Sequence, residues 1–267
     1  MSGETPTFPV HAVVPPAAVE VARATVSFGA MRALDEVSLS IPAGYCYGVV
    51  GESGSGKTTL MRAILGLQPL DHGSIAINGL PNARQRTGSR QRAKLVQAIL
   101  QDPAASLSPR RTVGQLLDEV GELLAEPRSS LRQRQAALFD RLGLPPATAD
   151  KYPHQISGGQ ARRVAVCRAL LMRPRVLIAD EPTAGLDVSV QGDLLNLLQD
   201  LRGSDQLTLI VVSHNLAVVR LIADHVAVMH RGRIVESGAA AAVFDAPQSD
   251  YARNLVAASP RLAARKA

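Results

Sequence analysis

A glycine-rich segment at residues 51–59 constrains the fold of this chain more than any other feature, because it stands directly after the apolar stretch 45–50. It contains the pattern Gly-x4-Gly-Lys-Thr, whose fixed positions are Gly51, Gly56, Lys57 and Thr58. Apolar residues then recur at helical spacing over 60–67, which predicts a strand, a loop and a helix in this order. Glycines let a backbone wrap closely around a phosphate chain, and N–H groups at the helix start supply an anion site. The sequence therefore predicts a phosphate-binding loop (P-loop).

The P-loop pattern also assigns roles to side chains. We expect Lys57 to reach the β- and γ-phosphates of a nucleotide, and the Thr58 hydroxyl to ligate Mg²⁺. The predicted nucleotide contacts are the whole segment: Gly51, Glu52, Ser53, Gly54, Ser55, Gly56, Lys57, Thr58 and Thr59. An ordinary loop rich in glycine and serine is the alternative, but it would not require all four fixed positions between a strand and a helix.

A second apolar stretch, 176–179, ends in the two acids Asp180 and Glu181. A P-loop needs a magnesium carboxylate at the end of a neighbouring strand, so Asp180 is predicted to bind Mg²⁺ directly or through water. Glu181 is predicted to polarise the attacking water as a general base. A pair of acids that caps a helix is the alternative. The two motifs together favour a nucleotide hydrolase.

The segment Ser157-Gly158-Gly159-Gln160 precedes a helix-like stretch and offers a further phosphate site. A serine and flexible N–H groups at a helix N-terminus suit an anion. One nucleotide does not need two such sites in a single chain. We therefore expect this segment to complete the ATP site of a second molecule, so that ATP holds a dimer together. A plain helix N-cap is the alternative.

From about Val19 to Val235 these segments resemble an ATP-binding cassette (ABC) protein, the nucleotide-binding subunit of a transporter. Residues 157–160 resemble the signature sequence of that family, which normally begins with Leu where this chain has Ile156. The resemblance implies an α/β fold, namely a P-loop NTPase core of ABC type with an antiparallel β subdomain and a mainly helical subdomain. It also implies ATP and Mg²⁺ as cofactors.

The same resemblance assigns four further site residues. Gln101 is similar to the Q-loop glutamine, which touches Mg²⁺ or the attacking water, and His214 to the switch histidine that contacts the γ-phosphate. Phe28 matches the aromatic residue that stacks on adenine. Asp187, in Ala-Gly-Leu-Asp, resembles the D-loop aspartate that signals across the dimer. A histidine at a strand end and an aromatic residue in the core or at a sheet edge are the simpler alternatives for His214 and Phe28.

Several stretches resemble the peptide and nickel importers within this family, among them 101–110, 152–155 and 187–191. The resemblance implies a peripheral ATPase subunit at the cytoplasmic face of the cell membrane, which powers import of peptides or nickel. Its expected partners are two membrane permeases, a second cassette and, indirectly, an extracytoplasmic solute-binding protein. A related second cassette chain is favoured over a second copy of this one. The alternatives are an ATPase subunit of a carbon–phosphorus lyase-type assembly and a soluble ABC ATPase outside transport.

The positions of proline and the spacing of apolar residues predict how the chain is organised. Prolines favour a flexible leader at 1–18. The ABC ATPase domain is expected at 19–235, with a helical subdomain at about 103–151, and a short C-terminal extension at 236–267. Strands that alternate with helices predict a doubly wound α/β core.

Composition excludes several other classes. A hydrophobic content of 46% rules out a wholly disordered chain. The sequence has no run of about 18 apolar residues, so no transmembrane helix is predicted. The formal charge of +6 fits an anionic small molecule, a membrane surface or nucleic acid equally well. The arginine-rich stretch 83–94 is predicted to be solvated surface, because no aromatic residues are interleaved for base stacking, and no nucleic acid is expected as a partner. Cys46 and Cys167 predict reduced thiols.

Overall fold

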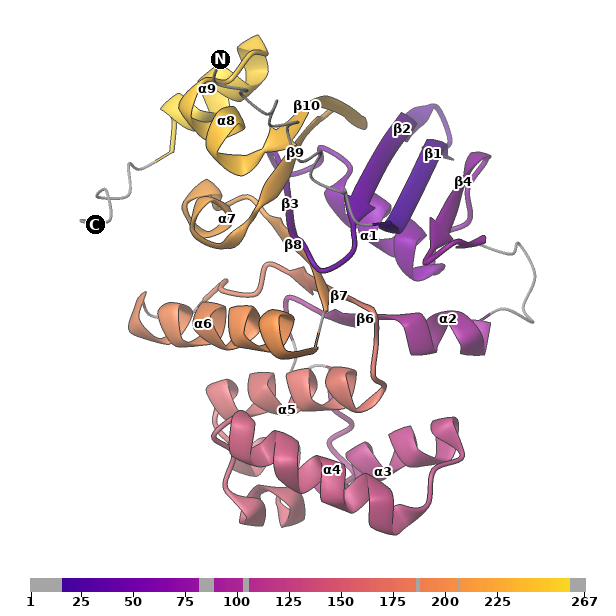
Figure 1. Ribbon diagram of the computed structural model, residues 1–267, viewed down its shortest axis with the longest axis vertical. Coiled ribbons are helices and arrows are strands. Elements are labelled where there is room, and N and C mark those ends of the chain that lie inside the picture. The colour runs from indigo at the N-terminus through magenta and orange to yellow at the C-terminus, as the bar shows by residue number, and fades with distance from the viewer. Residues whose placement is uncertain (1–15, 82–88, 103–105, 186–187, 206, 260–267) are drawn as a thin grey trace, which may run out of the picture.

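The computed structural model describes residues 16–81, 89–102, 106–185, 188–205 and 207–259. A six-stranded sheet runs through the middle of the molecule, with a four-stranded antiparallel sheet to one side (Figure 1). A layer of helices lies at one end, and helices α8 (Ala240–Asp245) and α9 (Asp250–Ala257) lie at the other (Figure 1). This arrangement agrees with the α/β fold that the sequence predicted.

The six-stranded sheet has the order β10-β9-β3-β8-β7-β6, and it is parallel except for β10, which runs antiparallel to β9. Its strands in chain order are β3 (Cys46–Val50), β6 (Val96–Ile99), β7 (Val176–Asp180), β8 (Thr208–Ser213), β9 (His225–His230) and β10 (Arg233–Ala239). Every residue of β3 and β8 is buried, as expected of strands covered on both faces. Alternate residues serve two separate cores: Val50 packs with the helical layer, whereas Val49 packs with the antiparallel sheet.

The antiparallel sheet has the order β2-β1-β4-β5. Its strands are β1 (Ala17–Phe28), β2 (Met31–Pro42), β4 (His72–Ile77) and β5 (Leu80–Pro81). The predicted leader is too long at its end, because Ala17 pairs with Pro42 and Ala18 is only 1% exposed. Pairing of Ala17 with β2 and burial of Ala18 hold both residues in the sheet, although prolines precede them in the sequence. The rest of the predicted leader, apart from Pro16, lies outside the described residues.

The helices connect and cover these sheets. In chain order they are α1 (Lys57–Leu65), α2 (Ser89–Leu95), α3 (Val113–Leu124), α4 (Arg128–Arg141), α5 (Gly158–Leu171), α6 (Val188–Asp205), α7 (Leu216–Ile222), α8 (Ala240–Asp245) and α9 (Asp250–Ala257), with short 3-10 turns η3 (Pro146–Asp150) and η4 (Pro153–Gln155). Helices α3 and α4 fall within the stretch expected to be helical and pack on α5. None of the helices in the described ranges has the length and apolar character needed to cross a membrane.

Two further expectations need correction. The boundary placed between 235 and 236 falls inside β10, where Glu236 pairs with Val228 of β9, so the C-terminal extension begins within the core sheet. Arg92, predicted to be solvated, is half-buried and donates hydrogen bonds to the carbonyl of Ile64 (2.9 Å) and that of Ala63 (3.2 Å). The last carbonyls of helix α1 have no partner in a following helical turn; that of Ala63 also accepts from the N–H of Gly66 (3.0 Å), and the long cation of Arg92 reaches both.

Candidate active site

A cleft of about 850 Å³ opens at the carboxyl ends of the parallel strands, where ligands bind in open α/β sheets. Its lining includes most of the predicted site: Phe28, Gly51, Glu52, Ser53, Gly54, Gly56, Lys57, Thr58, Thr59, Gln101, Asp180, Glu181 and His214. Ser55 is only 4% exposed and does not line the cleft, although it belongs to the same loop. Asp187 lies outside the described residues.

The P-loop is held by close backbone contacts that only glycine permits. Gly51 has a φ of +149°, and a Cβ there would lie 2.2 Å from the carbonyl oxygen of Met229 on β9. Gly56 has a φ of +105°, and its Cβ would lie 2.5 Å from the carbonyl oxygen of Ala33. The loop is therefore pressed between β9 and the start of β2, and any larger residue at these two positions would displace it.

Lys57, the first residue of α1, points back into the P-loop. Its Nζ donates hydrogen bonds to the carbonyl oxygens of Gly51 (2.7 Å) and Glu52 (2.8 Å), and the residue is 8% exposed. Burial lowers the pKa of Lys57, and the nearby carboxylates of Glu181 and Asp180 oppose that shift. The buried ammonium of Lys57 is hydrogen-bonded to backbone carbonyls, which phosphate oxygens can replace as its partners.

Glu181 follows β7 in a backbone conformation with a φ of +47°, a left-handed region that costs a non-glycine residue about 1–2 kcal/mol. Its N–H donates to the carbonyl of Val212 on β8 (2.8 Å). Its carboxylate accepts hydrogen bonds from the Ser213 hydroxyl (3.0 Å) and the backbone N–H of His214 (2.9 Å), and lies 2.6 Å from Nδ1 of His214. Glu181 and His214 thus form one hydrogen-bonded unit at the cleft, although 33 residues separate them.

The cleft also gathers oxygen ligands that suit a divalent cation. Thr58 in the first turn of α1, Gln101 beyond β6 and Asp180 at the end of β7 all line it. Burial and the adjacent carboxylate of Glu181 raise the pKa of Asp180, with Lys57 opposing the shift. A bound cation would favour the ionised form of this carboxylate. One hydroxyl, one amide and one carboxylate are the hard donors that Mg²⁺ takes together with phosphate and water, so these residues fit that ion.

The predicted signature residues lie elsewhere. Ser157 caps α5: its hydroxyl accepts from the N–H of Gln160 (3.2 Å), and the Gln160 side chain accepts from the N–H of Ser157 (3.1 Å). A Cβ at Gly158 would meet no atom within 4 Å, so the backbone there is open. Ser157, Gly159 and Gln160 line a separate cavity of about 650 Å³, which shares no lining residue with the P-loop cleft. Within one chain, the structure does not bring residues 157–160 to that cleft.

Arg162, which sequence reasoning missed, joins the signature helix to the loop after Glu181. It is buried in α5 and donates hydrogen bonds to the carbonyl oxygens of Pro182 and Ala184, the latter at 3.3 Å. Burial lowers the pKa of Arg162. The guanidinium of Arg162 donates to two carbonyls of one loop and thereby ties that loop to α5.

Five other cleft residues were not predicted to belong to the site: Met31, Arg32, Ala33, Arg231 and Leu255. They come from three distant segments, namely β2, the turn after β9 and helix α9. No local motif marks them. A prediction that β9 pairs with β3 would have brought Arg231 next to the P-loop, but such pairing is a tertiary property.

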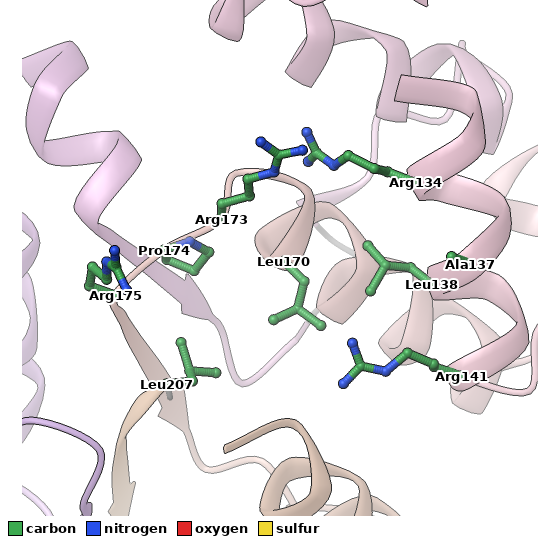
Figure 2. Close-up of a pocket in the computed structure, with 9 residues that line it drawn as sticks. All are labelled: Arg134, Ala137, Leu138, Arg141, Leu170, Arg173, Pro174, Arg175 and Leu207. Atoms are coloured by element: carbon green, nitrogen blue, oxygen red, sulfur yellow. The ribbon is translucent and has the colours of Figure 1, made fainter. Parts of the chain in front are cut away.

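Figure 2 shows a different cavity, of about 460 Å³, that none of the predicted site residues lines. Arginines 134 and 141 of α4 face it from one side, and residues 173–175 before β7 from the other (Figure 2). Arg134 is already paired with Glu126. Because this cavity adjoins the amino ends of β7 and β8, it is not part of the nucleotide cleft at their carboxyl ends.

Comparison with known proteins places this geometry in a family. The model of the ABC transporter family matches residues 34–184, more than half of the 267-residue chain. This chain belongs to the ABC transporter family. The ABC protein is 41% identical over 237 residues to the di/tripeptide transport ATP-binding protein DppF of Pseudomonas aeruginosa, which covers 87% of this chain and 72% of that relative. It is 40% identical to the oligopeptide transport ATP-binding protein OppD of Mycobacterium bovis, over 88% of this chain and 39% of that one.

Solved structures agree with this assignment. The ABC protein superposes on cbiO1 from Clostridium perfringens, part of the ABC transporter complex cbiONQ, with a TM-score of 0.79 at 29% identity over 86% of this chain and 92% of the other. It matches the ATP-binding cassette MJ0796, a dimer in a post-hydrolysis state bound to ADP and Pi, with a TM-score of 0.72 at 27% identity over 83% and 98%. The predicted ABC fold is confirmed, and the chain is an ATP-binding ATPase of this family.

Proposed function

We propose that this ABC ATPase powers a membrane importer for peptides. The observation that carries the proposal is the cleft that gathers Lys57, Asp180, Glu181 and His214 in a chain whose relatives are named as peptide transport ATP-binding proteins. The chain would act at the cytoplasmic face of the membrane, bound to two permeases. A solute-binding protein outside the membrane would deliver the peptide.

The cleft supplies each contact that ATP needs. Backbone N–H groups of the P-loop would bind the phosphates, and Lys57 would exchange its carbonyl partners for the β- and γ-phosphates. Phe28, 50% exposed at the mouth of the cleft, stacks on the adenine. Thr58, Asp180 and Gln101 would hold Mg²⁺, and the bound ion would neutralise charge on the phosphate oxygens.

Hydrolysis needs a base aimed at one water molecule. Glu181 takes a proton from that water as its oxygen bonds to the γ-phosphorus and the bond to the β-phosphate oxygen breaks. His214 contacts the γ-phosphate, and the donors from Ser213 and His214 fix where the Glu181 carboxylate lies. The strained backbone of Glu181 is consistent with a residue placed for chemistry.

A second cassette completes the site. Residues 157–160 lie away from the P-loop of their own chain, on the exposed start of α5, so they are free to face the P-loop of a partner cassette. Asp187 would carry the signal across this dimer. ATP binding then closes two cassettes and pulls on permeases docked near Gln101 and the helical layer, and hydrolysis reopens them. A related second chain is the expected partner.

The head-to-tail arrangement is tested by Ser157→Arg. We expect ATP hydrolysis at the partner's site to be abolished in the assembled complex, because a long cation at the exposed N-cap blocks the approach of the partner's nucleotide. ATP binding to the chain's own P-loop should be unchanged, since the two cavities share no residue. Ser157→Ala is the control, because it removes the cap, at a cost of about 1 kcal/mol, without adding bulk. Equal turnover at the site that holds Ser157, measured with the other site inactivated, would contradict this model.

The importer itself is tested by affinity purification of the tagged chain from detergent-solubilised membranes, followed by mass spectrometry. Two polytopic permeases and a second cassette are expected. The binding protein of that system can then be titrated with di- and tripeptides and with Ni²⁺, which separates peptide from nickel import. Co-purification of phosphonate enzymes or nucleic-acid machinery without permeases would overturn the proposal.

A further inference from the structure

Helix α9, in the C-terminal part of the chain, reaches the P-loop. The hydroxyl of Tyr251 accepts a hydrogen bond from the backbone N–H of Glu52 (3.2 Å). One turn further along the same face of α9, Leu255 lines the nucleotide cleft. Helix α9 therefore lines the same cleft as the P-loop, although Glu52 lies 199 residues earlier in the chain than Tyr251.

The contact holds one end of a peptide plane whose other end is held by Lys57. The carbonyl of Gly51 accepts from Nζ of Lys57 (2.7 Å), and the N–H of Glu52 in the same peptide group donates to Tyr251. In a trans peptide the C=O and N–H point in opposite directions, so the lysine and the tyrosine hold the plane from opposite sides. Rotation of this plane would swing the Gly51 carbonyl toward or away from the phosphate-binding cavity.

Tyr251 is itself held in place from two directions. Its ring lies against His230, the last residue of β9, with ring centroids 3.9 Å apart. The start of α9 is tied to β10 because the carboxylate of Glu236 accepts from the N–H of Gln248 (2.9 Å) and from both the N–H and the hydroxyl of Ser249 (2.8 Å each). These hydrogen bonds lower the pKa of Glu236 against the effect of its burial, so the tie persists at neutral pH.

The end of β9 is also where the P-loop rests. The Met229 carbonyl lies where a Cβ on Gly51 would clash with it, and the N–H of Gly232 donates to the carbonyl of Ser55 (2.9 Å). The end of β9 and the β9–β10 turn thus contact the P-loop, while Tyr251 of α9 binds the peptide group between Gly51 and Glu52.

We propose that Tyr251 is a positioning residue for the P-loop, so that helix α9 is a structural part of the nucleotide site. When Lys57 leaves the Gly51 carbonyl for a phosphate, Tyr251 is the side-chain partner that still holds this peptide plane. Its hydroxyl keeps the loop in the form that receives nucleotide and so strengthens ATP binding. The inference rests on the assignment of 51–59 as the phosphate-binding loop.

Tyr251→Phe removes the hydroxyl and keeps the ring against His230. Since one neutral hydrogen bond contributes about 0.5–1.5 kcal/mol, the dissociation constant of the full chain for a non-hydrolysable ATP analogue, measured by calorimetry, should rise about 2- to 10-fold. The backbone amide of Glu52 should exchange with solvent faster by a similar factor. In the transporter complex, KM for ATP should rise with little change in kcat.

Tyr45→Phe is the matched control, because Tyr45 packs on His225 at the opposite end of β9 with ring centroids 5.2 Å apart, away from the cleft. It should leave nucleotide binding and Glu52 exchange unchanged. A purely structural role for Tyr251 would lower the unfolding temperature without raising the dissociation constant, and that result would overturn the proposal. Lys57→Ala separates the two assignments. If that variant binds ATP like the parent, the assignment of 51–59 as the phosphate-binding loop is wrong. Unchanged binding in Tyr251→Phe alone refutes only the role of Tyr251.

Discussion

Replacing Glu181 by Gln will reduce ATP hydrolysis by about 10²- to 10⁴-fold, the usual contribution of a general base, and will leave ATP bound. The amide oxygen of Gln can still accept from the N–H of His214, and the Ser213 hydroxyl can turn to accept from the new NH₂ group, so the loop after β7 keeps its shape. The amide cannot take a proton from water. We therefore expect single-turnover hydrolysis to fall while ATP holds the two cassettes closed.

The measurement is release of radiolabelled phosphate under single-turnover conditions, with retention of labelled ATP on the protein followed in parallel. Glu20→Gln removes the same charge from an exposed position of β1 and should hydrolyse ATP like the parent. Hydrolysis at the parental rate in Glu181→Gln would show that another group accepts the proton. Loss of ATP binding in that variant would instead indicate that Glu181 shapes the cleft.

Lys57→Ala should weaken ATP binding by about 10- to 100-fold, because hydrogen bonds to a charged group contribute about 1.5–3 kcal/mol. The change removes the cation that would meet the phosphates and also frees the carbonyls of Gly51 and Glu52, which Lys57 holds within the loop. Both effects act on binding, so turnover should be lost through a raised dissociation constant. Calorimetric titration with a non-hydrolysable ATP analogue measures it directly.

Lys94→Ala is the charge-matched control, since Lys94 is exposed on α2 and does not line the cleft. Its dissociation constant should equal that of the parent. Should Lys57→Ala bind the analogue as tightly as the parent does, the assignment of residues 51–59 as the phosphate-binding loop would be wrong.

Local patterns were enough to predict the parts of the fold that carry their own signal. The strands expected at 45–50, 176–179 and 207–212 agree with β3, β7 and β8 to within one residue, because fully buried strands appear as short apolar runs between charged or turn residues. The strand–loop–helix order around Lys57 likewise follows from residues adjacent in the chain. By contrast, β9 and β10 were not singled out, and the domain boundary drawn at 235 consequently cuts through β10.

For the site, local motifs were enough to predict the chemistry: a lysine and glycines for phosphate, carboxylates at a strand end for a metal and a base, and the motifs of an ABC protein. How these groups come together depends on contacts between segments far apart in the chain. Strand pairing of β7 with β8 brings Glu181 to His214, and the return of the chain through β9 and α9 brings Tyr251 to Glu52. Such contacts join residues 33 and 199 positions apart, and the free energy that selects them comes from burial of whole sheets and helices, which no local motif records.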